Sequence, residues 1–191
     1  MPARKFFFEK KPIYGTHISM KKPFLLYGFL LPAFVVVFDQ LTKFWAVSAF
    51  DQPMSACEIN PYPNLQIELS PIVDLALVCN QGVSWGLLQG DSPVKRWVLT
   101  LFAFVMSCVL LCVLKGTKDR LSQISIGLII GGAVGNGIDR ALFGAVTDFI
   151  NFGDIGFHWV FNIADSAITI GVIGLLAASF LAPKEETKPA K

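Results

Sequence analysis

Long uncharged stretches alternate with short polar segments along the chain. Four stretches contain no Asp, Glu, Lys or Arg: residues 24–38, 97–114, 124–138 and 166–182. A helix needs about 20 residues to cross a bilayer, and three of these stretches reach that length only by including an acidic residue near one end. The pattern predicts four transmembrane helices, at about 24–46, 97–114, 122–142 and 161–182.

The segment between the first and second predicted helices, about residues 51–95, has a different pattern. It is rich in proline, and within it residues 65–69 alternate apolar and polar while residues 73–79 are mostly apolar. Both short runs predict strands, and together they predict a small sheet on the membrane surface. The expected fold class is an all-α membrane protein, with four transmembrane helices and a small extracytoplasmic β-rich region.

We expect one membrane domain, residues 23–183, between a basic leader, residues 1–22, and a short polar tail, residues 184–191. A competing interpretation makes the first apolar run a cleaved signal peptide, with a small-residue cleavage site near Val47. Asp39 and Lys43 argue against it, because they lie between the apolar run and the proposed cleavage point.

Composition supports a membrane protein. Hydrophobic residues make up 53% of the 191 residues and charged residues 16%, and the mean hydropathy is +0.57. About a quarter of the residues of soluble domains are charged, so both a soluble enzyme and a disordered chain are excluded. A net charge of +2 gives no argument for nucleic acid as a partner.

The cysteine and histidine residues do not form the patterns of a metal site or of a disulfide scaffold. The four cysteines form no CxxC pair, so neither a zinc site nor a disulfide scaffold is expected. His17 and His158 are the only histidines. We therefore expect neither a metal nor another cofactor.

Lys and Arg positions give the orientation. With the N-terminus in the cytoplasm, twelve basic residues lie inside and three (Lys95, Arg96 and Arg140) lie outside or near the outer helix ends. The positive-inside rule then puts both termini in the cytoplasm and residues 51–95 outside.

In this topology the polar residues of the spans lie at one depth, the outer leaflet boundary. The residues are Asp39, Lys43, Asn136, Asp139, Arg140, Asn162 and Asp165, and Asn80 and Asp148 lie in the adjoining outer loops. A charge within a bilayer is costly, so this convergence predicts one polar functional site. The alternative is that polar residues lie near helix ends because they are tolerated there.

Spacing adds detail to this region. Asp39 and Lys43 are four residues apart and can pair on one helix face. Asp139 and Arg140 point about 100° apart, so each needs a partner elsewhere, and we interpret both as orienting groups. The glycine run that begins at Gly131 predicts a tight helix–helix contact.

Five segments, in order along the chain, resemble the bacterial lipoprotein signal peptidases, the type II signal peptidases. They are Asp39-Gln-Leu-Thr-Lys43, Asn80-Gln-Gly82-Val-Ser-Trp-Gly86, Gly131-Gly-Ala-Val-Gly-Asn-Gly-Ile-Asp-Arg140, Val146-Thr-Asp-Phe149 and Phe161-Asn-Ile-Ala-Asp-Ser166. The departures are Trp85, where the family more often has Phe, Asn151, where an acidic residue often stands, and the long leader.

The resemblance implies an intramembrane aspartic endopeptidase in the bacterial cytoplasmic (inner) membrane, with its active site at the extracytoplasmic face. Its expected partners are membrane lipid and prolipoproteins, which it would cleave just before a cysteine that carries diacylglycerol. The family pattern gives Asp148 and Asp165 as the catalytic pair, and Asp139 is the rival of Asp148. The expected substrate-binding or orienting residues are Asp39, Lys43, Asn80, Gly82, Asn136, Asp139, Arg140, Asn162 and Ala164.

The residues themselves favour the same chemistry. Two close carboxyl groups share a proton, so one can act as base and the other as acid. Two other functions compete: a small transporter or channel, which would need polar residues through the full depth of the bilayer, and a structural membrane subunit.

Overall fold

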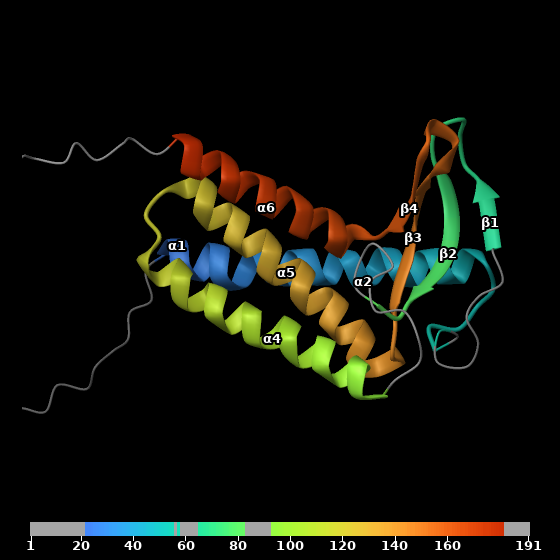
Figure 1. Cartoon of the computed structure of the whole chain (residues 1–191), viewed down its shortest axis with the longest axis horizontal. Helices are drawn as coiled ribbons and strands as arrows, with labels where there is room; N and C mark the ends of the chain where they lie inside the picture. Colours follow the sequence, from blue (N-terminus) through green and yellow to red (C-terminus); the bar gives the residue numbers. More distant parts are fainter. Residues whose placement is uncertain (1–21, 56, 58–64, 83–92, 182–191) are drawn as a thin grey trace, which may run out of the picture.

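The computed structural model describes residues 22–55, 57, 65–82 and 93–181. Its helical body contains four helices that are long and apolar enough to cross a membrane, as the sequence predicts. The first runs from Lys22 to Ala49 and comprises α1 (Lys22–Leu25), a π-helical turn η1 (Leu26–Leu30) and α2 (Leu31–Ala49). The others are α4 (Pro93–Gly116), α5 (Arg120–Phe143) and α6 (Ile163–Leu181) (Figure 1).

Helix α5 is the central helix of the body. In its most apolar window 56% of the residues are buried, against about a fifth in the other three spans. The predicted glycine contact is confirmed: a Cβ at Gly131 would lie 2.6 Å from the Val35 Cβ of α2, and one at Gly132 would collide with the Ala164 carbonyl oxygen of α6. Glycine therefore lets α5 lie against both neighbours at once.

Large apolar side chains cover the outer surfaces of the helices. Phe34 and Leu41 of α2, Trp97 of α4 and Ile173 of α6 are each more than half exposed. In a chain this apolar, such surfaces are suited to contact with lipid rather than with water.

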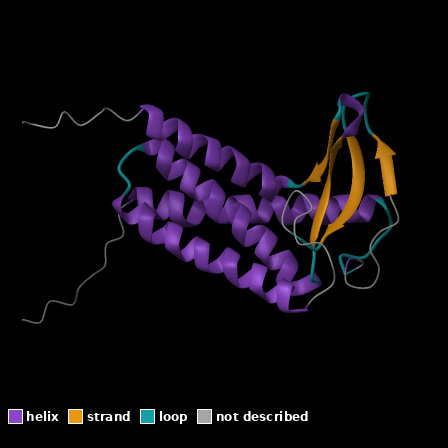
Figure 2. Cartoon of the chain, viewed as in Figure 1, coloured by secondary structure: helices purple, strands orange, loops and turns teal. Residues whose placement is uncertain are grey.

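A four-stranded antiparallel sheet lies at one end of the helical body (Figures 1 and 2). Its strands, in spatial and sequence order, are β1 (Leu65–Glu68), β2 (Asp74–Asn80), β3 (Val146–Phe152) and β4 (Phe157–Phe161). The first two are the strands that the sequence predicts. The opposite end of the body holds the start of α1, the turn between α4 and α5, and the end of α6.

The sheet corrects the prediction in two places. Asn80 and Asp148 were expected in loops, but Asn80 ends β2 and Asp148 lies within β3. The fourth helix begins at Ile163 instead of near 161, because Phe161 is still part of β4. Phe149 of β3 and Leu75 of β2 pack on Ala46 of α2, which attaches the sheet to the helices.

The structure contains one disulfide among the described residues, which the cysteine spacing did not predict. Cys57, in the segment after α2, is bonded to Cys79 of β2. It is a single bond between cysteines 22 residues apart, which is neither a CxxC pair nor a disulfide scaffold. Cys108 and Cys112, both on α4, are free.

Candidate active site

The site is assembled where the sheet meets α2, α5 and α6. At its base lies Lys43, whose side chain has no exposed surface. Its Nζ is 2.7 Å from Asp39 Oδ2 and 2.8 Å from Asp139 Oδ2, and it donates to Asn136 Oδ1 at 3.1 Å. The predicted pair on one face of the first helix is thus confirmed, and Asp139, whose partner was unknown, pairs with the same lysine.

Each of the two carboxylates on Lys43 also receives other donors. Asp39 Oδ1 accepts the backbone N–H of Ala164 at 2.9 Å, which joins α2 to the first turn of α6. Asp139 Oδ2 accepts the N–H of Thr147 at 3.2 Å, which joins α5 to β3. Gln40 donates to Asp139 Oδ1 at 2.7 Å. Lys43, Asp39 and Asp139 therefore connect α2, α5, α6 and β3 through charge-assisted hydrogen bonds.

A second layer, made of asparagines, lies above this one. Asn136 accepts from Lys43 and donates to Asp165 Oδ1 at 2.7 Å. Asn162 donates to Asp148 Oδ1 at 2.6 Å, and its Oδ1 accepts the N–H of Asp165 at 2.8 Å. Each amide both accepts and donates hydrogen bonds. Asn136 therefore connects Lys43 to the carboxyl group of Asp165, and Asn162 connects the carboxyl group of Asp148 to the backbone of Asp165.

Asp148 is enclosed, and it interacts with Asp165. It is 2% exposed and accepts from Asn80 Nδ2 at 3.0 Å as well as from Asn162. Burial raises the pKa of Asp148 well above its usual range, the carboxyl group of Asp165 acts in the same direction, and the Asn80 and Asn162 hydrogen bonds oppose both effects. A carboxyl group in this environment holds a proton at pH values at which an exposed aspartate has lost it.

Arg140 and Gly82 complete the upper layer. Arg140 donates through Nη2 to the carbonyl oxygen of Gly82 at 2.7 Å. The partner that the sequence left open for this guanidinium is therefore a backbone carbonyl group. Its charge also acts on Asp165 and Asp148. Gly82 is in turn held by the Asn80 side chain, which accepts its N–H at 3.0 Å. The rest of that motif, from Val83 to Gly86, lies outside the described residues.

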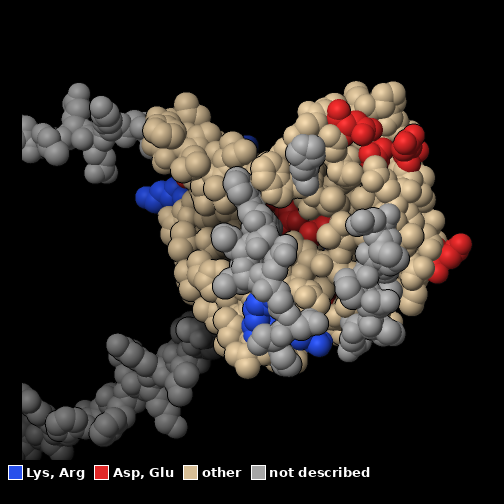
Figure 3. Space-filling model, turned by 45° about the vertical axis from the view of Figure 1, so that its right-hand side comes forward, with Lys and Arg blue, Asp and Glu red and all other residues tan. Residues whose placement is uncertain are grey.

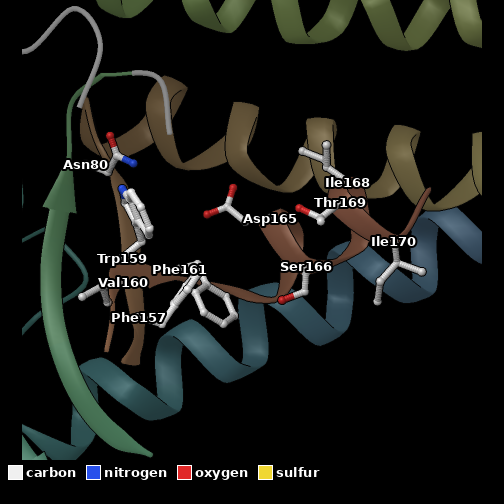
Figure 4. Close-up of a pocket in the computed structure, with 10 residues that line it drawn as sticks. All are labelled: Asn80, Phe157, Trp159, Val160, Phe161, Asp165, Ser166, Ile168, Thr169 and Ile170. Atoms are coloured by element: carbon white, nitrogen blue, oxygen red, sulfur yellow. The ribbon is translucent and has the colours of Figure 1, made fainter. Parts of the chain in front are cut away.

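A pocket of about 670 Å³ opens beside the carboxyl group of Asp165. Asp165 and Asn80 face this space from different elements (Figure 4), and its walls are mostly apolar residues of β4 and α6, among them Phe157, Phe161 and Ile168. In the space-filling view acidic atoms are visible in a hollow between the helical body and the sheet (Figure 3). The pocket therefore combines a mostly apolar lining with one carboxyl group.

The structure brings all eleven residues of the sequence-derived site into this one network. Sequence reasoning missed Gln40, which donates to Asp139 and weakly to Asp39, and Thr147, whose backbone N–H reaches Asp139. Both lie inside the motifs, and an uncharged amide within a span was the available signal for Gln40. Among the described residues no group of three His, Cys, Asp or Glu side chains is placed to hold a metal ion.

Fold and site together define a multi-pass membrane protein with a carboxylate-rich site beside an apolar pocket at one end of its helices. The family model described as signal peptidase (SPase) II matches residues 31–181. The chain belongs to the signal peptidase II family and is a peptidase of bacterial membranes.

Individual relatives agree. The chain is 38% identical over 168 residues to a lipoprotein signal peptidase of Methylobacterium radiotolerans, which covers 86% of this chain and 92% of the relative. It is 41% identical over 163 residues to one of Caulobacter vibrioides, covering 84% and 89%. A solved bacterial membrane enzyme, 32% identical, superposes with a TM-score of 0.61 over 86% of this chain and 94% of that one.

The buried lysine yields the first prediction. Lys43→Met leaves Asp39 and Asp139 as fully buried carboxylates without their cation, and breaking a buried ion pair in this way costs about 3–5 kcal/mol. We expect the variant to accumulate poorly in the membrane and to unfold at a lower temperature in detergent.

The matched control is Lys118→Met, which removes an exposed lysine from the turn between α4 and α5 and should behave as the unaltered protein does. Adding Asp39→Asn and Asp139→Asn to Lys43→Met should recover part of the lost stability. A Lys43→Met protein as abundant and as stable as the parent would contradict this account of the site's base.

Proposed function

We propose that this peptidase is an aspartic endopeptidase, with Asp148 and Asp165 as its catalytic pair, that removes signal peptides from prolipoproteins during lipoprotein maturation. The observation that carries the proposal is the convergence of these two carboxyl groups, each oriented by asparagines, beside an apolar pocket. The names of the relatives, lipoprotein signal peptidases, support the substrate class.

The hydrolysis follows from the sharing of one proton by the pair. One group, as carboxylate, takes a proton from the attacking water, while the other, as carboxylic acid, donates to the carbonyl oxygen of the scissile bond or to the leaving amine. The raised pKa of Asp148 supports this mixed state, because it favours a retained proton at pH values at which an exposed aspartate is charged.

The environment of Asp139 supports Asp148 over its rival. Asp139 is fully buried and forms an ion pair with Lys43, and it also accepts from Gln40 and from Thr147. A carboxylate with this many partners has a structural role. In contrast, Asp165 lines the pocket, and Asp148 interacts with the carboxyl group of Asp165.

The pair is tested by isosteric replacement. Asp148→Asn and Asp165→Asn should each lower the cleavage rate by more than about 100-fold, since an amide cannot exchange the proton, while the protein still inserts and accumulates. Cleavage of a diacylglyceryl-modified prolipoprotein by the purified protein, followed by gel mobility, measures this.

Asp154→Asn is the matched control, because Asp154 is exposed in the turn between β3 and β4 and its replacement should leave the rate unchanged. Asp139→Asn should instead reduce the amount of folded protein. If Asp148→Asn stayed active and Asp139→Asn were stable but inactive, the pair would be wrongly assigned.

We place both termini in the cytoplasm and the site at the extracytoplasmic face. The Lys and Arg distribution supports this orientation, and so does the position of the sheet at the end of the body opposite the start of α1 and the end of α6. Reporter fusions after Ser70 and Ile150 should report outside, and fusions after Thr117 and Lys188 inside. A cytoplasmic signal at Ile150 would put the catalytic pair on the wrong side of the membrane.

We also propose that the enzyme needs the diacylglyceryl group on the substrate cysteine. Two acyl chains, at about 0.8 kcal/mol per buried CH₂, keep the substrate in the membrane plane, and the apolar walls of the pocket support contact with such a substrate. Unmodified prolipoprotein, inserted to the same extent in the same lipid, should be cut at least about tenfold more slowly. Equal initial rates would remove lipid recognition from the proposal.

A further inference from the structure

The disulfide lies one residue away from a side chain of the catalytic site. Cys79 directly precedes Asn80 on β2, and Asn80 donates to Asp148. Cys57 is 4% exposed, and its Sγ lies 3.9 Å from the hydroxyl oxygen of Thr147, the neighbour of Asp148 on β3. The bond thus contacts both strands that carry residues of the upper layer.

The strand register shows that Asn80 lies at an end of its strand. Cys79 is opposite Thr147 and Val78 is opposite Asp148, so Asn80 is opposite Val146 and reaches Asp148 diagonally from the last position of its strand. Strand ends open more easily than strand centres, so fixing the preceding residue restricts the directions that Asn80 can take. The disulfide fixes that residue to the segment that follows α2.

We propose that the Cys57–Cys79 disulfide positions Asn80 against Asp148, so that the oxidised protein is the fully active form. The inference rests on the proposed function of Asp148. The cysteines contact neither the attacking water nor the substrate: they are positioning residues that act through Asn80.

The chemistry is ordinary thiol–disulfide exchange. In oxidation, two thiols lose two protons and two electrons to the disulfide of an oxidising partner protein, whose two thiols are formed in return; secretory compartments favour this reaction. In reduction, a thiolate of dithiothreitol attacks one sulfur, the S–S bond breaks, and the second thiol of the reagent completes the exchange as its cyclic disulfide. The proposed topology places Cys57 and Cys79 on the oxidising side.

The existence of the bond is tested first. The full-length protein, purified without reductant, is unfolded with an alkylating reagent present and weighed by mass spectrometry. Two of the four cysteines should be alkylated, namely Cys108 and Cys112, and all four after reduction. Alkylation of all four without reductant would overturn the proposal.

Kinetics test the positioning role. Reducing the folded wild-type protein should lower kcat about tenfold with little change in KM, and oxidised glutathione should restore it. A disulfide that only held the sheet together would instead alter KM and the melting temperature along with kcat. Cys57→Ala/Cys79→Ala should match the reduced protein and be indifferent to reductant.

Asn80→Ala decides whether the effect passes through Asn80. This variant should already be slow, and reduction should slow it no further, because the side chain that the disulfide positions is gone. If reduction slows Asn80→Ala by the same factor as wild type, the effect does not pass through Asn80 and the proposal is wrong.

Two controls complete the design. Cys108→Ser/Cys112→Ser, which alters the exposed cysteines of α4, should keep both the wild-type kcat and its loss on reduction. Reversible reduction also keeps the test decisive if the cysteine variants do not fold. A wild-type protein that cleaves equally well oxidised and reduced would refute this inference but leave the proposed function intact, whereas one that cleaves in neither state would contradict the proposed function.

Discussion

A single buried cation underlies the site. Lys43 has no exposed surface, and its ammonium group is within 2.8 Å of carboxylates from two helices. A lone charge within a bilayer would cost several kcal/mol, so the lysine and its carboxylates are each tolerated only because the other is present. Through the donors to Asp39 and Asp139 the same group fixes the first turn of α6 and the start of β3. The fold and the site are therefore stabilised by the same contacts.

Four carboxyl groups lie close together here, and their surroundings give them different capacities. Asp39 and Asp139 each form an ion pair with Lys43 and have no exposed surface. Asp148 contacts amides in a buried position and interacts with another carboxyl group, which raises its pKa. Asn136 links the two layers, because the oxygen of its amide faces Lys43 and the nitrogen faces Asp165. The chemical role of each aspartate therefore depends on its neighbours as well as on the carboxyl group itself.

The sequence predicted those parts of the structure that depend on periodic or costly residues. Uncharged runs located the four spans, and the cost of polar groups in lipid located the charged and amide residues of the site. Gly82, Ala164 and the choice of Asp148 and Asp165 as the pair came from the family resemblance. The second hairpin was missed, because β3 is nearly continuous with the end of α5 and its buried face offers no alternation to detect. Pairings between distant positions, such as Lys43 with Asp139 or Cys57 with Cys79, depend on tertiary contacts that spacing in one chain does not specify. Gln40 was missed for the same reason: its partner Asp139 is 99 residues away.

The central claim is that Asp148 and Asp165 work as a pair that holds one proton. The most direct test is the pH dependence of kcat for the purified enzyme on a lipid-modified substrate. A rate that falls both in acid, where the base of the pair is protonated, and in alkali, where its acid loses the proton, is the predicted result. Because Asp148 has a raised pKa, the alkaline fall should lie well above the range in which exposed aspartates titrate. A rate that rose with pH and then stayed level into alkali would contradict the claim, because no protonated carboxyl group would then be needed.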